Sequence, residues 1–301
     1  MMALLKIGIL TFMLTFITQA SVAQSYIGII LDGYQEDCKV KHKNVEYNCS
    51  EKRGLLEGDE IIKKLDIEKL EIKWAPYTSG KKLNETTLQV IFKPPDKNKK
   101  GILNMLMEFI GFVKTEHKVF KAATRGGAPK SAILFEKAIP QPCDNATIIS
   151  HQKIPFIWEG GGERIVFKNS KSITIFQKEI KGESSIQLTP EEIGMKPSET
   201  YTWSVEGAIM KKPFKIKLLR DKIAEQITSG LKEIDNGKIT DTERWIKKSA
   251  YLQFMSDIYP EEIELYWLSH KIFMENIKDE NKLNEEEKGL LERIGRHCKY
   301  L

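Results

Sequence analysis

The hydrophobic period of this chain changes at Pro213, and that change constrains the fold more than any other feature of the sequence. Before Pro213, apolar residues form short, β-branched runs that are punctuated by turn residues, which is the pattern of strands. After Pro213, apolar residues recur at helical spacing. We therefore expect an α+β protein that is mostly β in its N-terminal two-thirds and ends in an α-helical bundle.

The region from residue 24 to about residue 150 carries short apolar runs separated by turn signals such as Asp32-Gly33 and Pro94-Pro95. Strands at this spacing predict a barrel or sandwich rather than a parallel sheet with crossover helices. The expected strands cover residues 26–31, 55–62, 70–74, 88–92, 118–122 and 132–135.

A second β pattern runs from residue 151 to residue 212 and predicts a smaller sandwich. Trp158, Tyr201 and Trp203 fall on its strands, where large aromatic side chains fill the space between two facing sheets. The alternative for these aromatics is a carbohydrate-binding platform. The expected strands cover residues 154–158, 164–167, 173–177, 185–188 and 200–206.

The region 213–301 predicts four helices, at residues 214–234, 240–259, 260–277 and 284–300. Residues Thr240 to Glu243 have the sequence of a capping box, which marks a helix start. Apolar residues at helical spacing should form the core of the bundle. They are Trp245, Ala250, Leu252, Phe254, Met255, Ile258, Ile263, Leu265, Tyr266, Trp267, Leu268, Ile272 and Phe273.

The segment 101–113 interrupts the first β region, because it is apolar around nearly its whole circumference. It is too short to span a bilayer, which takes ~20 residues. Two interpretations stay open. The segment is a helix that folds over the open end of the β domain, or it is a helix whose side chains Met105, Phe109 and Phe112 contact a membrane surface or a protein partner.

Residues 1–23 have the pattern of an export signal, with Lys6, an apolar run, and the small residues Ser21 and Ala23 before the expected cut. We expect cleavage after Ala23 and a periplasmic or secreted protein. The alternative is a leader that is retained as an N-terminal anchor. The formal net charge of +5 is too small to indicate a nucleic-acid partner.

The sequence contains 4 cysteines, an even number that favours disulfides in an oxidising compartment. Cys38 and Cys49 flank two short expected strands with Lys43-Asn44 at the turn, so we predict that they staple a hairpin. Cys143 and Cys298 either form a second disulfide between the middle and the end of the chain or remain as two free thiols.

Two short motifs in the first β region resemble the FecR-like domains of bacterial envelope proteins. The residues from Leu55 to Ile62 read LLEGDEII and are similar to the "L-x-x-G-D-x-I" turn of that family, and Ala123 to Gly127 read ATRGG and are similar to its later "T-R-G" step. The resemblance implies an all-β, non-enzymatic module. The chain departs from the members that relay signals across an inner membrane, because it lacks their transmembrane helix and cytoplasmic tail.

The region that follows resembles the immunoglobulin or fibronectin-like module found after such domains, through Pro155-Phe156-Ile157-Trp158 and Tyr201-Thr202-Trp203. Together the two resemblances cover residues 26 to 210. They imply a modular envelope protein with the domain boundaries given above, and they do not extend to the helical end.

No recognisable catalytic constellation is present. The 5 histidines form no HExxH or Cys-His signature, and the glycine clusters lack the spacing that cradles phosphates, so we expect no metal, no cofactor and no catalytic residue. Arg125 lies between Thr124 and Gly126, where a guanidinium could bind a carboxylate or phosphate ligand. Its alternative role is to pair with strand-end carbonyls or with an acid such as Asp59.

The sequence therefore favours a non-enzymatic periplasmic or cell-envelope protein that binds a protein partner or acts as a scaffold, with a docking surface on its helical end. Two alternatives are a hydrolase of envelope polymers with a non-standard acidic site, and a membrane-surface protein that uses the segment 101–113. A glycosidase needs two carboxyl groups that face each other across a cleft, which only a structure can show.

Overall fold

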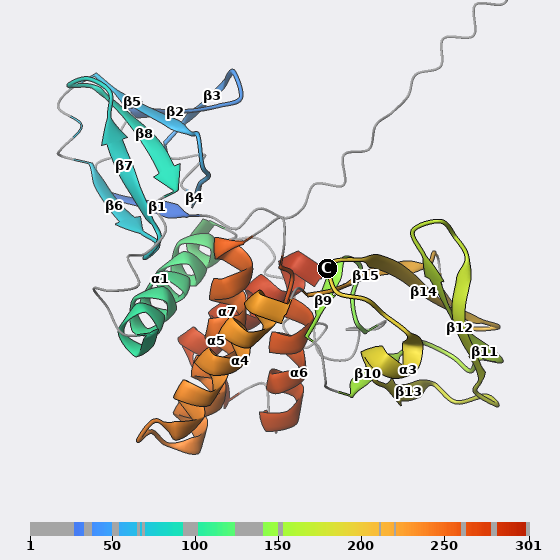
Figure 1. Cartoon of the computed structure of the whole chain (residues 1–301). Helices are drawn as coiled ribbons and strands as arrows, with labels where there is room; N and C mark the ends of the chain where they lie inside the picture. The colour runs from blue at the N-terminus through green and yellow to red at the C-terminus, as the bar shows by residue number, and fades with distance from the viewer. Residues whose placement is uncertain are drawn as a thin grey trace, which may run out of the picture.

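The computed structural model describes residues 27–32, 38–49, 54–64, 67, 70–92, 102–123, 141–149, 153–210, 212–219, 221–259, 263–277 and 282–298. The fold is α+β, as expected, with strands in the first two-thirds of the chain and helices at its end. In Figure 1, the helices lie in the middle, with a first β region on one side and a second on the other. The leader 1–23, Arg125 and the expected strand 132–135 lie outside the described residues.

The first β region consists of two antiparallel sheets, a three-stranded sheet in the order β4-β1-β6 and a five-stranded sheet in the order β3-β2-β5-β8-β7. Its core is formed by β-branched side chains such as Ile29, Val40 and Ile61, which are fully buried. The strands are β1 (Gly28–Asp32), β2 (Cys38–His42), β3 (Val45–Asn48), β4 (Gly54–Leu55), β5 (Glu60–Lys63), β6 (Glu71–Trp74), β7 (Thr78–Lys82) and β8 (Thr87–Phe92).

The predicted hairpin and its disulfide are confirmed. β2 and β3 pair antiparallel, and the Cys38–Cys49 disulfide closes their open end. Lys43 and Asn44 form the turn with φ values of 47° and 74°. Positive φ at both central residues is the geometry that matches the right-handed twist of the two flanking strands.

The expected strand 55–62 is wrong in one respect, because a turn divides it into β4 and β5. Gly58 adopts a φ of 82°, which favours glycine, and the Asp59 carboxylate accepts a hydrogen bond of 2.9 Å from the backbone N–H of Leu56. The segment that carries the "L-x-x-G-D-x-I" resemblance is thus a turn held by a buried aspartate.

Helix α1 (Ile102–Ala123) is longer than the apolar segment 101–113, and the expected strand 118–122 is wrong. Its apolar side chains Met105, Phe109 and Phe112 are buried in the core of the chain rather than at a surface for a membrane or a partner. The helix continues beyond residue 113 because it packs against the C-terminal helices, which supply partners for its polar residues. No helix in the described part of the chain has the length and apolarity to cross a membrane.

The second β region is a sandwich of a five-stranded sheet, β12-β11-β14-β15-β9, and the pair β10-β13. The expected packing of the aromatics is confirmed, since Trp158, Tyr201 and Trp203 are buried and the Phe156 ring lies 5.2 Å from that of Trp203. The elements are β9 (Ala146–Ile148), β10 (Ile154–Ile157), β11 (Arg164–Asn169), β12 (Thr174–Glu179), β13 (Ser185–Leu188), helix α3 (Pro190–Ile193), β14 (Thr200–Glu206) and β15 (Phe214–Leu218).

Strand β15 corrects the expected helix 214–234, which in fact begins only at Asp221. Phe214 to Leu218 alternate apolar and lysine residues, and the period of two places Ile216 and Leu218 in the core. β15 pairs antiparallel with β14 and parallel with β9, so the segment completes a mixed sheet.

The C-terminal helices are α4 (Asp221–Asn236), α5 (Asp241–Ile258), α6 (Tyr266–Asn276) and α7 (Glu285–Cys298). The predicted capping box is confirmed at the start of α5, where Thr240 and Glu243 bond each other's backbone N–H groups. Helix α1 packs on α5 and α7, so the bundle also includes a helix from the first half of the chain. Every residue of the predicted bundle core is buried except Trp245, Ile258 and Ile272, which are partly buried against that core.

Strand β9 fastens the sandwich to the bundle. The backbone N–H of Thr147 donates to the Glu264 carbonyl at 2.8 Å, and the Thr147 hydroxyl accepts from the Glu264 N–H at 2.8 Å. The indole N–H of Trp267 donates to the Thr147 carbonyl, also at 2.8 Å. These bonds satisfy backbone groups that would otherwise be buried at the junction without a hydrogen-bond partner.

Candidate functional site

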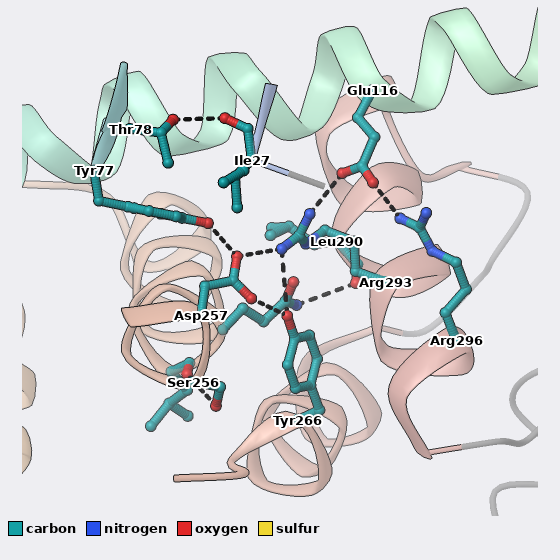
Figure 2. Close-up of polar contacts among 12 residues, drawn as sticks. Ile27, Tyr77, Thr78, Glu116, Ser256, Asp257, Tyr266, Leu290, Arg293 and Arg296 are labelled. Atoms are coloured by element: carbon teal, nitrogen blue, oxygen red, sulfur yellow. Dashed lines mark hydrogen bonds and ion pairs between the residues drawn. The ribbon is translucent and has the colours of Figure 1, made fainter. Parts of the chain in front are cut away.

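A buried cluster of charged and phenolic side chains lies where α1 and the C-terminal helices meet the first β region (Figure 2). We call it the Arg293 cluster. It draws on a turn between two strands and on four helices. Its members are Tyr77, Glu116, Asp257, Tyr266, Arg293 and Arg296.

Close packing of α1 and α7 positions the cluster. A Cβ atom on Gly289 of α7 would lie 2.9 Å from Cγ1 of Val113 and 3.1 Å from its carbonyl oxygen. Only glycine allows the two backbones to approach this closely. One turn further along α7, Arg293 then faces Glu116 on α1.

Glu116 bridges two arginines. Its Oε2 lies 2.6 Å from Nη1 of Arg293, and its Oε1 lies 2.7 Å from Nη2 of Arg296. The side chains of Glu116 and Arg293 are each only 1% exposed. Burial raises the pKa of Glu116, but the attraction of Arg293 and Arg296 outweighs burial, so the pKa lies below its ordinary value.

Asp257 collects the other donors at the end of α5. Arg293 Nη2 donates to Oδ2 of Asp257, the Tyr77 hydroxyl donates to the same oxygen at 2.5 Å, and the Tyr266 hydroxyl donates to Oδ1 at 2.6 Å. Burial, followed by the negative charge of Asp257, raises the pKa of Tyr77 well above its ordinary value. The phenol therefore stays protonated and acts as a hydrogen-bond donor.

Aromatic rings line the cluster. The guanidinium carbon of Arg293 lies 5.3 Å from the centre of the Phe109 ring, a distance at which a cation and a π face attract each other. The His297 imidazole stacks on the Tyr266 ring at 3.7 Å. Burial, together with repulsion from Arg293 and Arg296, lowers the pKa of His297 to about 3, so its imidazole is neutral at physiological pH.

The cluster holds together elements that are remote in the chain. Two arginines and two carboxylates balance in charge, and both carboxylates are occupied by guanidinium or phenol groups. Arg293, Glu116 and Asp257 are all buried. Among the guanidinium nitrogens of Arg293, Nε is the one with no hydrogen-bond partner in the described part of the chain.

A second buried group contains the sulfur atoms of Cys143 and Cys298 and the carboxylate of Glu264. Their donor atoms all lie within 4.8 Å of one another, and Cys143 lies 3.7 Å from Oε2 of Glu264. Thiolate and carboxylate donors are of the kind that binds zinc. Burial raises the pKa of Glu264 to about 8 and that of Cys143 well above its ordinary value, so the site favours neutral groups.

Two of the described histidines pair with carboxylates. His42 lies 2.5 Å from the Asp59 carboxylate, and His117 lies 2.7 Å from that of Glu292. Asp59, which the sequence offered as a partner for Arg125, thus binds a histidine and a backbone N–H. Burial lowers the pKa of His270 to about 4, and its ring bonds the Gln141 side chain at 2.7 Å.

Sequence reasoning missed the Arg293 cluster, although a signal for it exists. Arg293 occupies the apolar face of α7 beside the buried residues Leu290 and Ile294, and a charge on such a face needs a buried partner. The sequence does not identify that partner, because Glu116 and Asp257 lie on helices remote in the chain.

No protein-family model and no curated protein matches the chain at a significant level.

Proposed function

We propose that the chain is a non-enzymatic binding or scaffold protein of the bacterial cell envelope, which acts through protein–protein contacts. The Arg293 cluster carries this proposal. A reactive site needs an acid, a base or a nucleophile that a substrate can reach. Here a buried set of charges joins elements from both halves of the chain, and its carboxylates are enclosed.

Three observations support the envelope location. The Cys38–Cys49 disulfide is typical of proteins that fold in an oxidising compartment. The leader 1–23 has the pattern of an export signal. The resemblance to FecR-like domains and to an immunoglobulin-like module also favours a non-enzymatic envelope protein.

We place the docking surface on the β2–β3 hairpin, in place of the helical end that the sequence favoured. β3 is an edge strand of the five-stranded sheet, and all four of its residues are exposed. Val45 and Tyr47 are 51% and 37% exposed and, being two positions apart, lie on one face of the strand. An edge strand offers backbone N–H and C=O groups to another extended chain.

The partner that fits this edge strand is an extended segment of another envelope protein, which would add to the sheet as a further strand beside β3. Backbone hydrogen bonds would supply affinity, and Val45 and Tyr47 would supply selectivity through apolar contacts. The Cys38–Cys49 disulfide holds the hairpin closed, which lowers the ordering cost that binding must overcome.

We test this surface with point substitutions rather than with removal of the helical end, because α7 supplies both arginines of the Arg293 cluster and its loss would expose α1. The exported chain, carrying a photo-cross-linker in place of Tyr47, is irradiated in bacterial envelopes. Tyr47→Lys is the disrupting variant. Ile173→Lys is the matched control, because Ile173 is 57% exposed on the second β region.

We expect one protein to become cross-linked to the chain. A synthetic peptide of its extended segment should slow amide hydrogen exchange along β3. Binding of that peptide should fall at least tenfold in Tyr47→Lys and stay unchanged in Ile173→Lys. Equal binding of the peptide by both variants would show that its binding site is not β3. Turnover of an envelope polymer by the purified chain would overturn the non-enzymatic function.

A further inference from the structure

The sulfur atoms of Cys143 and Cys298 lie 2.7 Å apart, although 155 positions separate them in the chain. This distance is shorter than nonbonded contact between two sulfurs, and it exceeds a disulfide bond by only ~0.7 Å. Both side chains are buried, and the structure holds them as thiols.

We propose that Cys143 and Cys298 are a site of covalent modification, at which the two thiols form a second disulfide. We call this disulfide the latch, because it joins the sandwich to the last helix. Cys143 precedes β9 in the sandwich, and Cys298 ends α7 in the bundle. The latch is independent of the proposed partner, because it joins two parts of the same chain.

Closure consumes one small disulfide, such as oxidised glutathione. The thiolate of Cys298, whose side chain is 8% exposed against 2% for Cys143, attacks that disulfide and releases one thiol. The Cys143 sulfur then loses its proton, attacks the Cys298 sulfur and releases the second thiol. Each protein sulfur loses one electron and one proton, and the two sulfurs of the oxidant gain them.

The same geometry argues against a metal ion as the resident of this site. Two thiolates that bind one zinc ion at ~2.3 Å should subtend a tetrahedral angle. Sulfurs 2.7 Å apart would subtend only about 72° at such an ion. The pair must open to hold zinc, whereas it needs only a slight approach to form a disulfide.

The latch depends on the packing that brings α7 to the sandwich. The Arg293 cluster fixes α7 against α1 and α5, and the bonds of Thr147 fix β9 against the start of α6. Together they present the two thiols to each other at high effective concentration. The Cys38–Cys49 hairpin closes locally and does not need this packing.

The experiment uses the full chain, reduced and then incubated without denaturant in a buffer of oxidised and reduced glutathione. Remaining thiols are alkylated, and peptide masses are read after proteolysis. The proposal expects a cross-linked peptide pair that contains Cys143 and Cys298, and a melting temperature higher than that of the Cys298→Ser variant by on the order of 10 °C.

Alkylation of both cysteines, with Cys38–Cys49 closed in the same sample, would overturn the latch. So would retention of one zinc ion per chain with both thiols protected from alkylation but still reduced. Because Cys298→Ser could disturb folding, Arg293→Met gives a second reading. This substitution should lower the yield of the Cys143–Cys298 bond severalfold and leave the yield of the Cys38–Cys49 bond unchanged. A yield of the Cys143–Cys298 bond equal to that of the unaltered chain would contradict the proposed coupling.

Discussion

The guanidinium of Arg293 lies 2.6 Å from the carboxylate of Glu116, although 177 positions separate the two residues. α1 and α7 carry them, and Figure 1 shows these helices side by side in the centre of the molecule. The pair therefore closes the chain on itself, and it shares Arg293 with Asp257 on α5. Most of the testable consequences of the fold concern this region.

Replacement of Arg293 by methionine should lower the free energy of unfolding by about 3–5 kcal/mol, because it leaves Glu116 and Asp257 as buried carboxylates without their shared partner. Urea denaturation measures the effect. Arg164→Met is the matched control, since the Arg164–Glu206 pair is about half exposed and should contribute at most about 1 kcal/mol. Equal losses in the two variants would show that the cluster does not support the fold.

Two helical glycines should respond to alanine with opposite signs. Gly111 of α1 has nothing within 4 Å of an added Cβ, so Gly111→Ala should stabilise the chain by about 0.5–1 kcal/mol through helix propensity. Gly289 meets Val113 at 2.9 Å, so Gly289→Ala should destabilise it by about 1–3 kcal/mol. Thermal melts of both variants check the pair, and stabilisation by Gly289→Ala would refute the close approach of α1 and α7.

Stability should depend on pH through His297. Its pKa is about 3 in the folded chain against an ordinary value of 6.5, so the unfolded state binds one more proton between these limits. The free energy of unfolding should therefore fall as the pH drops from 6.5 toward 3, by up to ~1.4 kcal/mol per pH unit from this residue. His297→Phe retains a ring that can stack on Tyr266 and should flatten that slope. The measurement is urea unfolding at a series of pH values, and an unchanged slope would count against a buried neutral imidazole.

Trp203 should be essential to the sandwich rather than to ligand binding. Its side chain is fully buried and lies between Phe156 and Phe214, so Trp203→Ala should cost about 3–5 kcal/mol. Ile173→Ala, at an exposed position of the same region, should change stability by less than ~0.5 kcal/mol. Chemical denaturation followed by tryptophan fluorescence compares them. Comparable stability of both variants would contradict the packing of the Trp203 side chain in the core of the sandwich.

Local patterns determined the elements whose stability is local. The Cys38–Cys49 hairpin needed only two strands and a turn that tolerates positive φ. The capping box at Thr240 needed residues three positions apart. Burial of the sandwich aromatics followed from their size and their placement on strands. In each case the deciding interaction spans few residues, so the sequence alone could indicate it.

Tertiary contacts decided the remainder. Residues 118–122 are helical because α1 packs on α7, and residues 214–218 form a strand because β14 and β9 lie on either side of them. The Arg293–Glu116 pair and the approach of Cys143 to Cys298 likewise join positions more than a hundred residues apart. A single sequence states which side chains need a buried partner, but only the folded chain brings that partner near, because the pairing energy depends on distances that no local pattern records.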